Sequence, residues 1–170
     1  WLRDGLELFK SASETEELIK SLKEDSKVLV VPAFTGLGAP HWDPDARGSI
    51  FGLTRDSGIP ELTAATLESI TFLTKDLIGA MTKDGADLVE LRIDGGMVAN
   101  SWFSQLLANT LNISVLRPRV TETSALGAAF LAGINSGLLP NINALHSVWS
   151  CERSFFPEKH RVSQMEDKYE

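Results

Sequence analysis

The chain has 170 residues, of which 43% are hydrophobic and 23% are charged, and this balance is typical of a globular protein. Its formal net charge of −7 argues against broad nucleic-acid binding, which needs a basic face. A lone cysteine, Cys151, excludes both an internal disulfide and a Cys-based zinc site. No apolar run approaches the roughly 20 residues that cross a bilayer. We therefore expect a cytoplasmic protein that binds neither nucleic acid nor membrane.

The first segment has the features of a chain that begins inside a longer protein. Its first residue is Trp1 rather than methionine. Residues 1–9 have an amphipathic pattern, so we expect them to form the end of a helix. Ser13 is followed three residues later by Glu16, which is a capping-box pattern. This pattern predicts a short helix that reaches about Leu22.

Strand-like and helix-like segments then alternate along the chain. Apolar, β-rich composition predicts strands at residues 28–34, 49–53, 88–93 and 113–118, the first of them buried. A helical period of apolar residues predicts helices at residues 60–82, 98–111 and 122–137. Gly137 lies where a C-cap glycine is expected. This alternation indicates an α/β domain, followed by a less regular tail at residues 140–170 that includes a polar last helix.

The segment "TGLGAPHWDPDARG", residues 35–48, is a long loop with two features that could bind a ligand. Its glycines resemble a phosphate-binding loop, but it lacks the Lys-Ser/Thr ending, and Pro40 stands where a helix should begin. His41 and Asp43 could ligate a metal, but no third ligand is near in sequence. We favour a structured loop in which both side chains form hydrogen bonds.

The segment "LRIDGGMVAN", residues 91–100, carries two adjacent glycines between a predicted strand and a predicted helix. Glycine allows a positive φ, and it also lets a ligand approach the main chain because it has no Cβ atom. Asn100, four residues beyond Gly96, has a side chain that can both donate and accept hydrogen bonds. The residues alone leave two interpretations open, a plain tight turn and a ligand site.

Two further features are interpreted as structural. Glu68 and Asp76 lie eight residues apart on the predicted helix 60–82 and could form an acid–base pair, but we expect a solvated face. The predicted helix 122–137 is rich in Ala and Gly, which lets two backbones come close. We expect it to pack closely under the glycine turn.

Residues 48–68, "GSIFGLTRDSGIPELTAATLE", match the long, spaced C-terminal signature of the FGGY carbohydrate kinases. The chain resembles that family from Trp1 to about Tyr169. Within the family, residues 32–48, 94–100 and 117–133 are most similar to the members that phosphorylate glycerol. The resemblance implies the actin/hexokinase-type ATPase fold, in which two ribonuclease-H-like domains face each other across a cleft. This chain would be an incomplete second domain, with residues 140–170 as its C-terminal extension.

The resemblance also implies a function. The parent enzyme would transfer the γ-phosphoryl group of ATP to glycerol, giving glycerol 3-phosphate, with Mg²⁺ as cofactor. Carried over from the family, Gly96 and Asn100 would contact ATP or ADP, and Gly95 would support the turn. The general base, the acceptor-binding residues and the Mg²⁺ ligands fall before Trp1. We therefore assign no catalytic residue and no metal ligand to this chain, and we expect it to be inactive alone.

Two alternatives stay open at this point. The parent could be an FGGY kinase for another polyol or a pentulose, or the chain could be a non-enzymatic, actin-like nucleotide-binding module. The signature at residues 48–68 argues against the module, and residues 35–48 and 120–129 argue by resemblance against another acceptor. A homo-oligomer is compatible with the full-length enzyme.

Overall fold

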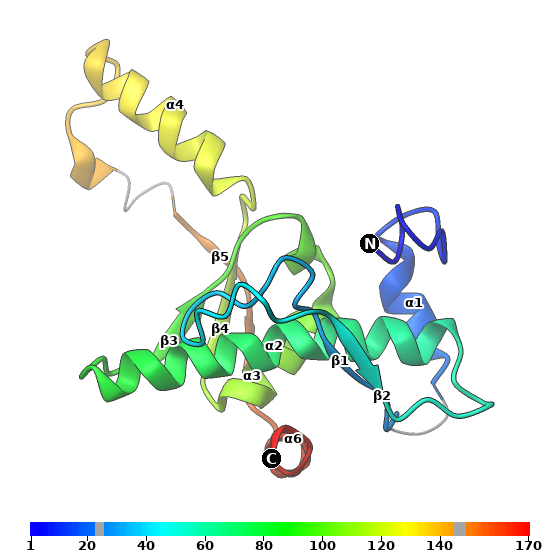
Figure 1. Ribbon diagram of the computed structural model, residues 1–170. Coiled ribbons are helices and arrows are strands. Elements are labelled where there is room, and N and C mark those ends of the chain that lie inside the picture. The colour runs from blue at the N-terminus through cyan, green and yellow to red at the C-terminus, as the bar shows by residue number, and fades with distance from the viewer. Residues whose placement is uncertain (23–25, 145–148) are drawn as a thin grey trace.

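The computed structural model describes residues 1–22, 26–144 and 149–170 (Figure 1). Its elements, in chain order, are α1 (Glu14–Lys20), β1 (Leu29–Val31), β2 (Ser49–Phe51), α2 (Ile59–Lys83), β3 (Glu90–Arg92), the 3₁₀ helix η1 (Gly96–Ala99), α3 (Ser101–Leu111), β4 (Ser114–Pro118), α4 (Thr123–Asn135), the 3₁₀ helix η2 (Ile142–Ala144), β5 (Cys151–Phe155) and α6 (Lys159–Tyr169). Strands β1 and β2 pair antiparallel, whereas β3, β4 and β5 form a mixed sheet in that order. The α/β class is as predicted.

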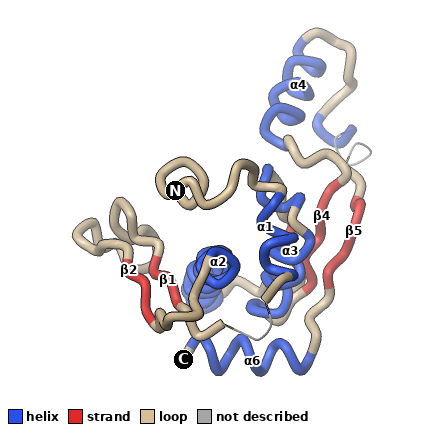
Figure 2. The backbone as a smooth tube through the Cα atoms, turned by 90° about the vertical axis from the view of Figure 1, so that its right-hand side faces the viewer, coloured by secondary structure: helices blue, strands red, loops and turns tan. Residues whose placement is uncertain are grey.

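Helix α2 is the central element between the two sheets. It contacts β1 on one side and α3 on the other, and α3 in turn covers β4 (Figure 2). On the β1 side, the buried residues Val28, Val30 and Ala65 form one core cluster. Between the helices, the buried hydroxyl groups of Thr71 and Thr110 form a hydrogen bond of 3.0 Å.

The second core cluster lies between α3 and the mixed sheet. Leu107 and Ala108 on α3 pack against Val115 and Phe155, which are 0% and 2% exposed. Val115 is paired with Leu91 on one side and with Phe155 on the other. The parallel β3–β4 pair therefore holds the segment that follows β3 in a fixed position beside α3.

The structure corrects two expectations about the N-terminal part of the chain and adds one strand in the tail. Residues 1–9 are not helical but form turns, in which the amides of Gly5 and Leu6 both donate to the Trp1 carbonyl. The strand predicted at residues 28–34 spans only Leu29–Val31 and is buried on one face only: Val30 packs toward α2, whereas Leu29 and Val31 are exposed. Strand β5 was not predicted, because four of its five residues are exposed and they lack an apolar pattern.

The last helix, α6, is attached to α2 by polar contacts. The Lys168 ammonium pairs with Glu68 at 2.5 Å, and their side chains are only 18% and 12% exposed. The Tyr169 hydroxyl donates to Asp76, and this bond raises the pKa of Tyr169 to about 12. The expected solvated face at Glu68 and Asp76 is therefore wrong, because α6 covers it.

Helix α4 does not pack under the glycine turn as expected. It extends away from the rest of the molecule in both views (Figures 1 and 2). Gly137 follows its C-terminal end with φ +79°, which is the predicted C-cap conformation. The small residues of α4 indicate that another segment can pack closely against the helix, but they do not identify that segment.

The adjacent residues Phe155 and Phe156 give a matched test of the β5 register. Phe155 is 2% exposed and Phe156 is 64% exposed. We expect Phe155→Ala to lower the free energy of unfolding by about 3 kcal/mol, and Phe156→Ala to change it by less than about 0.5 kcal/mol. Urea denaturation followed by tryptophan fluorescence measures both. Equal losses would show that the register is wrong.

Candidate functional site

The two glycines lie in a turn that joins β3 to η1 and α3. Ile93 still belongs to the sheet, because its amide donates to the Leu116 carbonyl at 3.1 Å. Gly95 then leaves the strand, and its amide donates to the Thr121 carbonyl at 2.8 Å. The turn is thus attached to the segment after β4 as well as to β3. Two parallel strands fix its position.

The two glycines are present for different reasons. Gly95 has φ +88°, a conformation that residues with a Cβ atom rarely adopt, so the backbone itself requires glycine there. Gly96 has no such φ, and a Cβ atom added to it would meet nothing within 4 Å. The fold of this chain therefore does not explain Gly96, and the space beside it is open to a ligand.

Asn100 lies at the junction of η1 and α3 and caps the helix. Its Oδ1 atom accepts from the Phe103 amide at 2.9 Å, and its Nδ2 atom donates to the Thr15 hydroxyl at 3.1 Å. One amide hydrogen and one lone pair of the side chain are left over for another partner. The helix-capping role was missed, although an Asn before an apolar helical run is a sequence signal for it.

Arg117, also missed, connects the turn to the sheet. Its side chain, 9% exposed, pairs with Glu152 of β5 at 2.8 Å. Its Nη1 atom donates to the Val98 carbonyl of η1 at 2.9 Å. The signal was present: in the predicted strand 113–118, two-residue alternation places Arg117 on the same buried face as Val115.

The loop at residues 35–48 forms the hydrogen bonds that we expected of it. His41 Nε2 bonds to Asp76 at 2.9 Å, and the Asp43 carboxylate accepts from the amides of Asp45 and Ala46. In the part of the chain that the structure describes, no three His, Cys, Asp or Glu side chains come together as metal ligands would. No helix within these described ranges has the length and apolar character that a membrane crossing needs.

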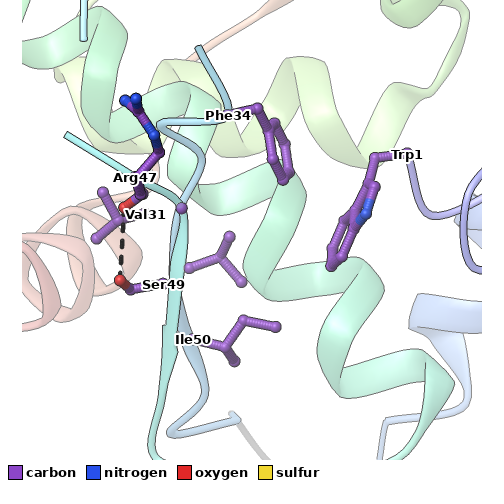
Figure 3. A pocket seen from close by; sticks show the side chains of 8 residues that line it. Trp1, Val31, Phe34, Arg47, Ser49 and Ile50 are labelled. Carbon is purple, nitrogen blue, oxygen red and sulfur yellow. Dashed lines mark hydrogen bonds between the residues drawn. The ribbon is translucent and has the colours of Figure 1, made fainter. Parts of the chain in front are cut away.

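A hollow of about 390 Å³ lies beside the same loop and is mainly apolar (Figure 3). Trp1 and Phe34 form one wall, with ring centroids 5.1 Å apart, and Val31 and Ile50 come from the β1–β2 pair. None of the predicted nucleotide-binding residues lines it. The hollow and the glycine turn are therefore separate features.

The family follows from a comparison with known protein families. Residues 1–136 match the model for the C-terminal domain of the FGGY family of carbohydrate kinases. The chain belongs to this family.

Curated FGGY relatives include glycerol kinases from several bacteria. The glycerol kinase of Marinomonas sp. (strain MWYL1) is 53% identical over 157 residues, which are 92% of this chain and 32% of that protein. Glycerol kinase 1 of Pseudomonas aeruginosa is 50% identical over 155 residues, 91% of this chain and 31% of that protein. The chain thus spans about one third of the length of these relatives.

Solved structures of FGGY kinases share the fold. Plasmodium falciparum glycerol kinase with ADP superposes with a TM-score of 0.81 at 28% identity, covering 99% of this chain and 34% of that one. A ligand-bound xylulose kinase from Lactobacillus acidophilus gives 0.80 at 25% identity, covering 99% and 35%. The fold is therefore that of the C-terminal domain of these actin/hexokinase-like kinases. The assignment of Gly95, Gly96 and Asn100 to a nucleotide stays a prediction.

The Arg117 contacts give a test of what holds the turn. Arg117→Met leaves the Val98 carbonyl and Glu152 without their shared partner, so we expect a loss of about 2 kcal/mol in the free energy of unfolding. Arg119→Met removes the same charge from an exposed residue and should cost less than about 0.5 kcal/mol. Urea denaturation of both variants measures the difference. Indistinguishable midpoints would contradict the role given to Arg117.

Proposed function

We propose that this chain is the incomplete C-terminal domain of an ATP-dependent glycerol kinase. The parent enzyme transfers the γ-phosphoryl group of ATP to glycerol, giving glycerol 3-phosphate, and works in the cytoplasm. Residues 1–170 form the domain, with residues 140–170 as its extension. The observation that carries the proposal is the 53% identity to a bacterial glycerol kinase over 92% of the chain.

The part of this chain in catalysis is to hold the nucleotide at the glycine turn. A nucleotide can approach the main chain at Gly96, where no Cβ atom and no neighbouring group blocks it. Gly95 gives the turn its shape, and Asn100 offers the amide hydrogen and lone pair that α3 and Thr15 leave unused. These contacts would position the phosphates, and positioning supplies much of the catalysis in phosphoryl transfer.

Other parts of the reaction are assigned outside this chain. Following the resemblance to the family, we place the Mg²⁺ ligands in the preceding part of the enzyme. The general base and the glycerol-binding residues belong there too. The chain alone would accordingly be inactive. For the full-length enzyme we propose ATP and glycerol as substrates, and other copies of itself as the only protein partners.

A second candidate is an FGGY kinase with a larger acceptor. The xylulose kinase from Lactobacillus acidophilus superposes nearly as well as the glycerol kinase does, so backbone similarity does not separate the acceptors. The curated relatives favour glycerol, because glycerol kinases reach 50–53% identity over more than nine tenths of this chain. We therefore prefer glycerol.

Gly96 gives the sharpest test of the nucleotide site. In the full-length enzyme, we expect Gly96→Val to weaken ADP binding by about tenfold, because the new side chain occupies the space of the ligand. Gly79→Val on α2 is the matched control, since an added Cβ atom also meets nothing within 4 Å there. Isothermal titration calorimetry measures both. Unchanged ADP affinity in Gly96→Val would remove the glycine turn from the site.

A second pair of variants separates the two roles of Asn100. Asn100→Ala removes the helix cap and should cost about 1 kcal/mol of stability whether or not a nucleotide binds. Asn100→Asp keeps the oxygen that accepts from Phe103, but it loses the amide donor and adds a negative charge. If Asn100 contacts the nucleotide, Asn100→Asp should weaken ADP binding while retaining the cap. Wild-type affinity in Asn100→Asp would limit Asn100 to capping.

The acceptor is tested with a substrate panel on the full-length enzyme. We expect glycerol to give the highest kcat/KM with ATP and Mg²⁺ when compared with dihydroxyacetone, xylulose, ribulose and gluconate. The isolated 170-residue chain is the control and should release no ADP with glycerol. A preference for a pentulose or gluconate would overturn the acceptor but keep the kinase. ATP binding without any phosphorylation would favour the non-enzymatic module.

A further inference from the structure

Helix α1 lies beside the start of α3, next to the glycine turn (Figure 2). Two consecutive residues of α1 make polar contacts there. The Nδ2 atom of Asn100 donates to the Thr15 hydroxyl at 3.1 Å. The amide of Ser101 donates to the Glu16 carboxylate, also at 3.1 Å. A segment 85 residues earlier in the chain is therefore attached to the predicted nucleotide site.

The Thr15 hydroxyl group is mostly buried, and its only proton is already in use. Thr15 is 9% exposed, and its Oγ1 atom donates to the Ala12 carbonyl at 2.7 Å. A hydroxyl group has a single proton to donate, so toward Asn100 the same oxygen can only accept. The atom of Asn100 that faces it must therefore be the amide nitrogen, Nδ2.

These contacts fix the orientation of the Asn100 side chain. Its Oδ1 atom accepts from the Phe103 amide, while Nδ2 donates to Thr15. An amide rotated by 180° would place Oδ1 against an oxygen with no proton to offer, and Nδ2 against an N–H group. Two bonds, one at each polar atom, also fix the plane of the amide, whereas the bond to Phe103 alone would let it pivot. Thr15 therefore sets the directions of the second Nδ2 hydrogen and the second Oδ1 lone pair.

We propose that Thr15 is a positioning residue for nucleotide binding and that it acts through Asn100. Its hydroxyl group holds the amide plane of Asn100 so that the remaining hydrogen and lone pair face the nucleotide. A side chain that is oriented before the ligand arrives loses less conformational entropy on binding, which raises the affinity. The inference rests on the proposed function, in which Asn100 contacts ATP or ADP, and it adds a residue from outside the glycine turn.

Removing the hydroxyl group without changing the shape of the side chain tests the proposal. In the full-length enzyme, Thr15→Val leaves Oδ1 of Asn100 bonded to Phe103 but deprives Nδ2 of its partner. We expect the Kd of ADP to rise about fivefold, the scale of one hydrogen bond. Thr15→Ser restores the hydroxyl group and should stay within about twofold of the wild type. Isothermal titration calorimetry measures both, and a wild-type Kd in Thr15→Val overturns the proposal.

Thr71 on α2 provides the matched control. Its hydroxyl group also donates to the carbonyl three residues earlier, that of Glu68 at 2.8 Å, and it also contacts α3, at Thr110. Thr71→Val therefore removes the same group from similar contacts at the opposite end of α3 from Asn100. We expect it to lower the melting temperature without changing the Kd of ADP. A rise in Kd as large as that of Thr15→Val would indicate a general loss of α3 packing and would overturn the positioning role.

A double-mutant cycle shows whether Thr15 acts through Asn100. In the Asn100→Ala background the amide that Thr15 orients is absent, so adding Thr15→Val should change the Kd of ADP by less than about 1.5-fold. A purely structural role of Thr15 would not depend on the side chain at position 100. A further rise of about fivefold in that background would therefore overturn the proposal.

The unaltered enzyme covers the case in which Thr15→Val does not fold. Crystal structures of the full-length enzyme without and with ADP give the distance between Asn100 Nδ2 and Thr15 Oγ1 in both states. We expect it to stay within about 3.5 Å in both, because a group that positions Asn100 for the nucleotide must still hold it in the complex. A bond that is broken in the ADP complex would overturn the proposal.

Activity with glycerol separates this inference from the proposed function. If the affinity for ADP depends on Thr15 and Asn100 as expected but the full-length enzyme does not phosphorylate glycerol, the positioning role stands and the proposed function fails. If the enzyme phosphorylates glycerol and Asn100→Ala weakens ADP binding while Thr15→Val does not, the positioning role is overturned and the proposed function stands.

Discussion

The position of the glycine turn depends on one buried cation. A guanidinium group removed from water needs a full set of partners, and Arg117 finds them on two segments distant in sequence. Glu152 on β5 supplies the negative charge, and the carbonyl of Val98 in η1 accepts a further hydrogen bond. Arg117 itself is fixed in β4. Strand β5, near the end of the chain, thus helps to position a turn more than fifty residues before it.

Polar contacts also attach the C-terminal helix, and one of them involves a residue of the family signature. Glu68 is the last residue of the signature at residues 48–68, and its carboxylate receives the Lys168 ammonium. Lys168 also donates to the Ser26 carbonyl at 2.9 Å, so a single side chain connects α6, α2 and the segment before β1. This signature residue therefore has a structural partner at the other end of the chain. The last residue of the signature thus helps to hold α6 against α2.

The sequence predicts where the helices lie along the chain better than it predicts which elements pack against each other. Helices α2, α3 and α4 lie close to their predicted ranges because a helical period is a local property. Strand β5 could not be found in this way, since only Phe155 is buried and its partner β4 is more than thirty residues away. The packing of α4 was misjudged because Ala and Gly specify close approach without specifying a partner. At the turn, the sequence could not distinguish the roles of the two glycines. The positive φ of Gly95 and the open space beside Gly96 do distinguish them.

The bond between Tyr169 and Asp76 makes the attachment of α6 sensitive to alkali. A phenol that titrates near 10 in the unfolded chain keeps its proton in the folded chain until about pH 12. The stabilisation from this hydrogen bond is complete below pH 10, declines as the pH rises from 10 to 12, and is absent above that range. Once the phenol ionises, a phenolate and a carboxylate face each other at the last turn of α6. Ionisation of the phenol therefore loosens the helix from its C-terminal end, where Tyr169 meets Asp76.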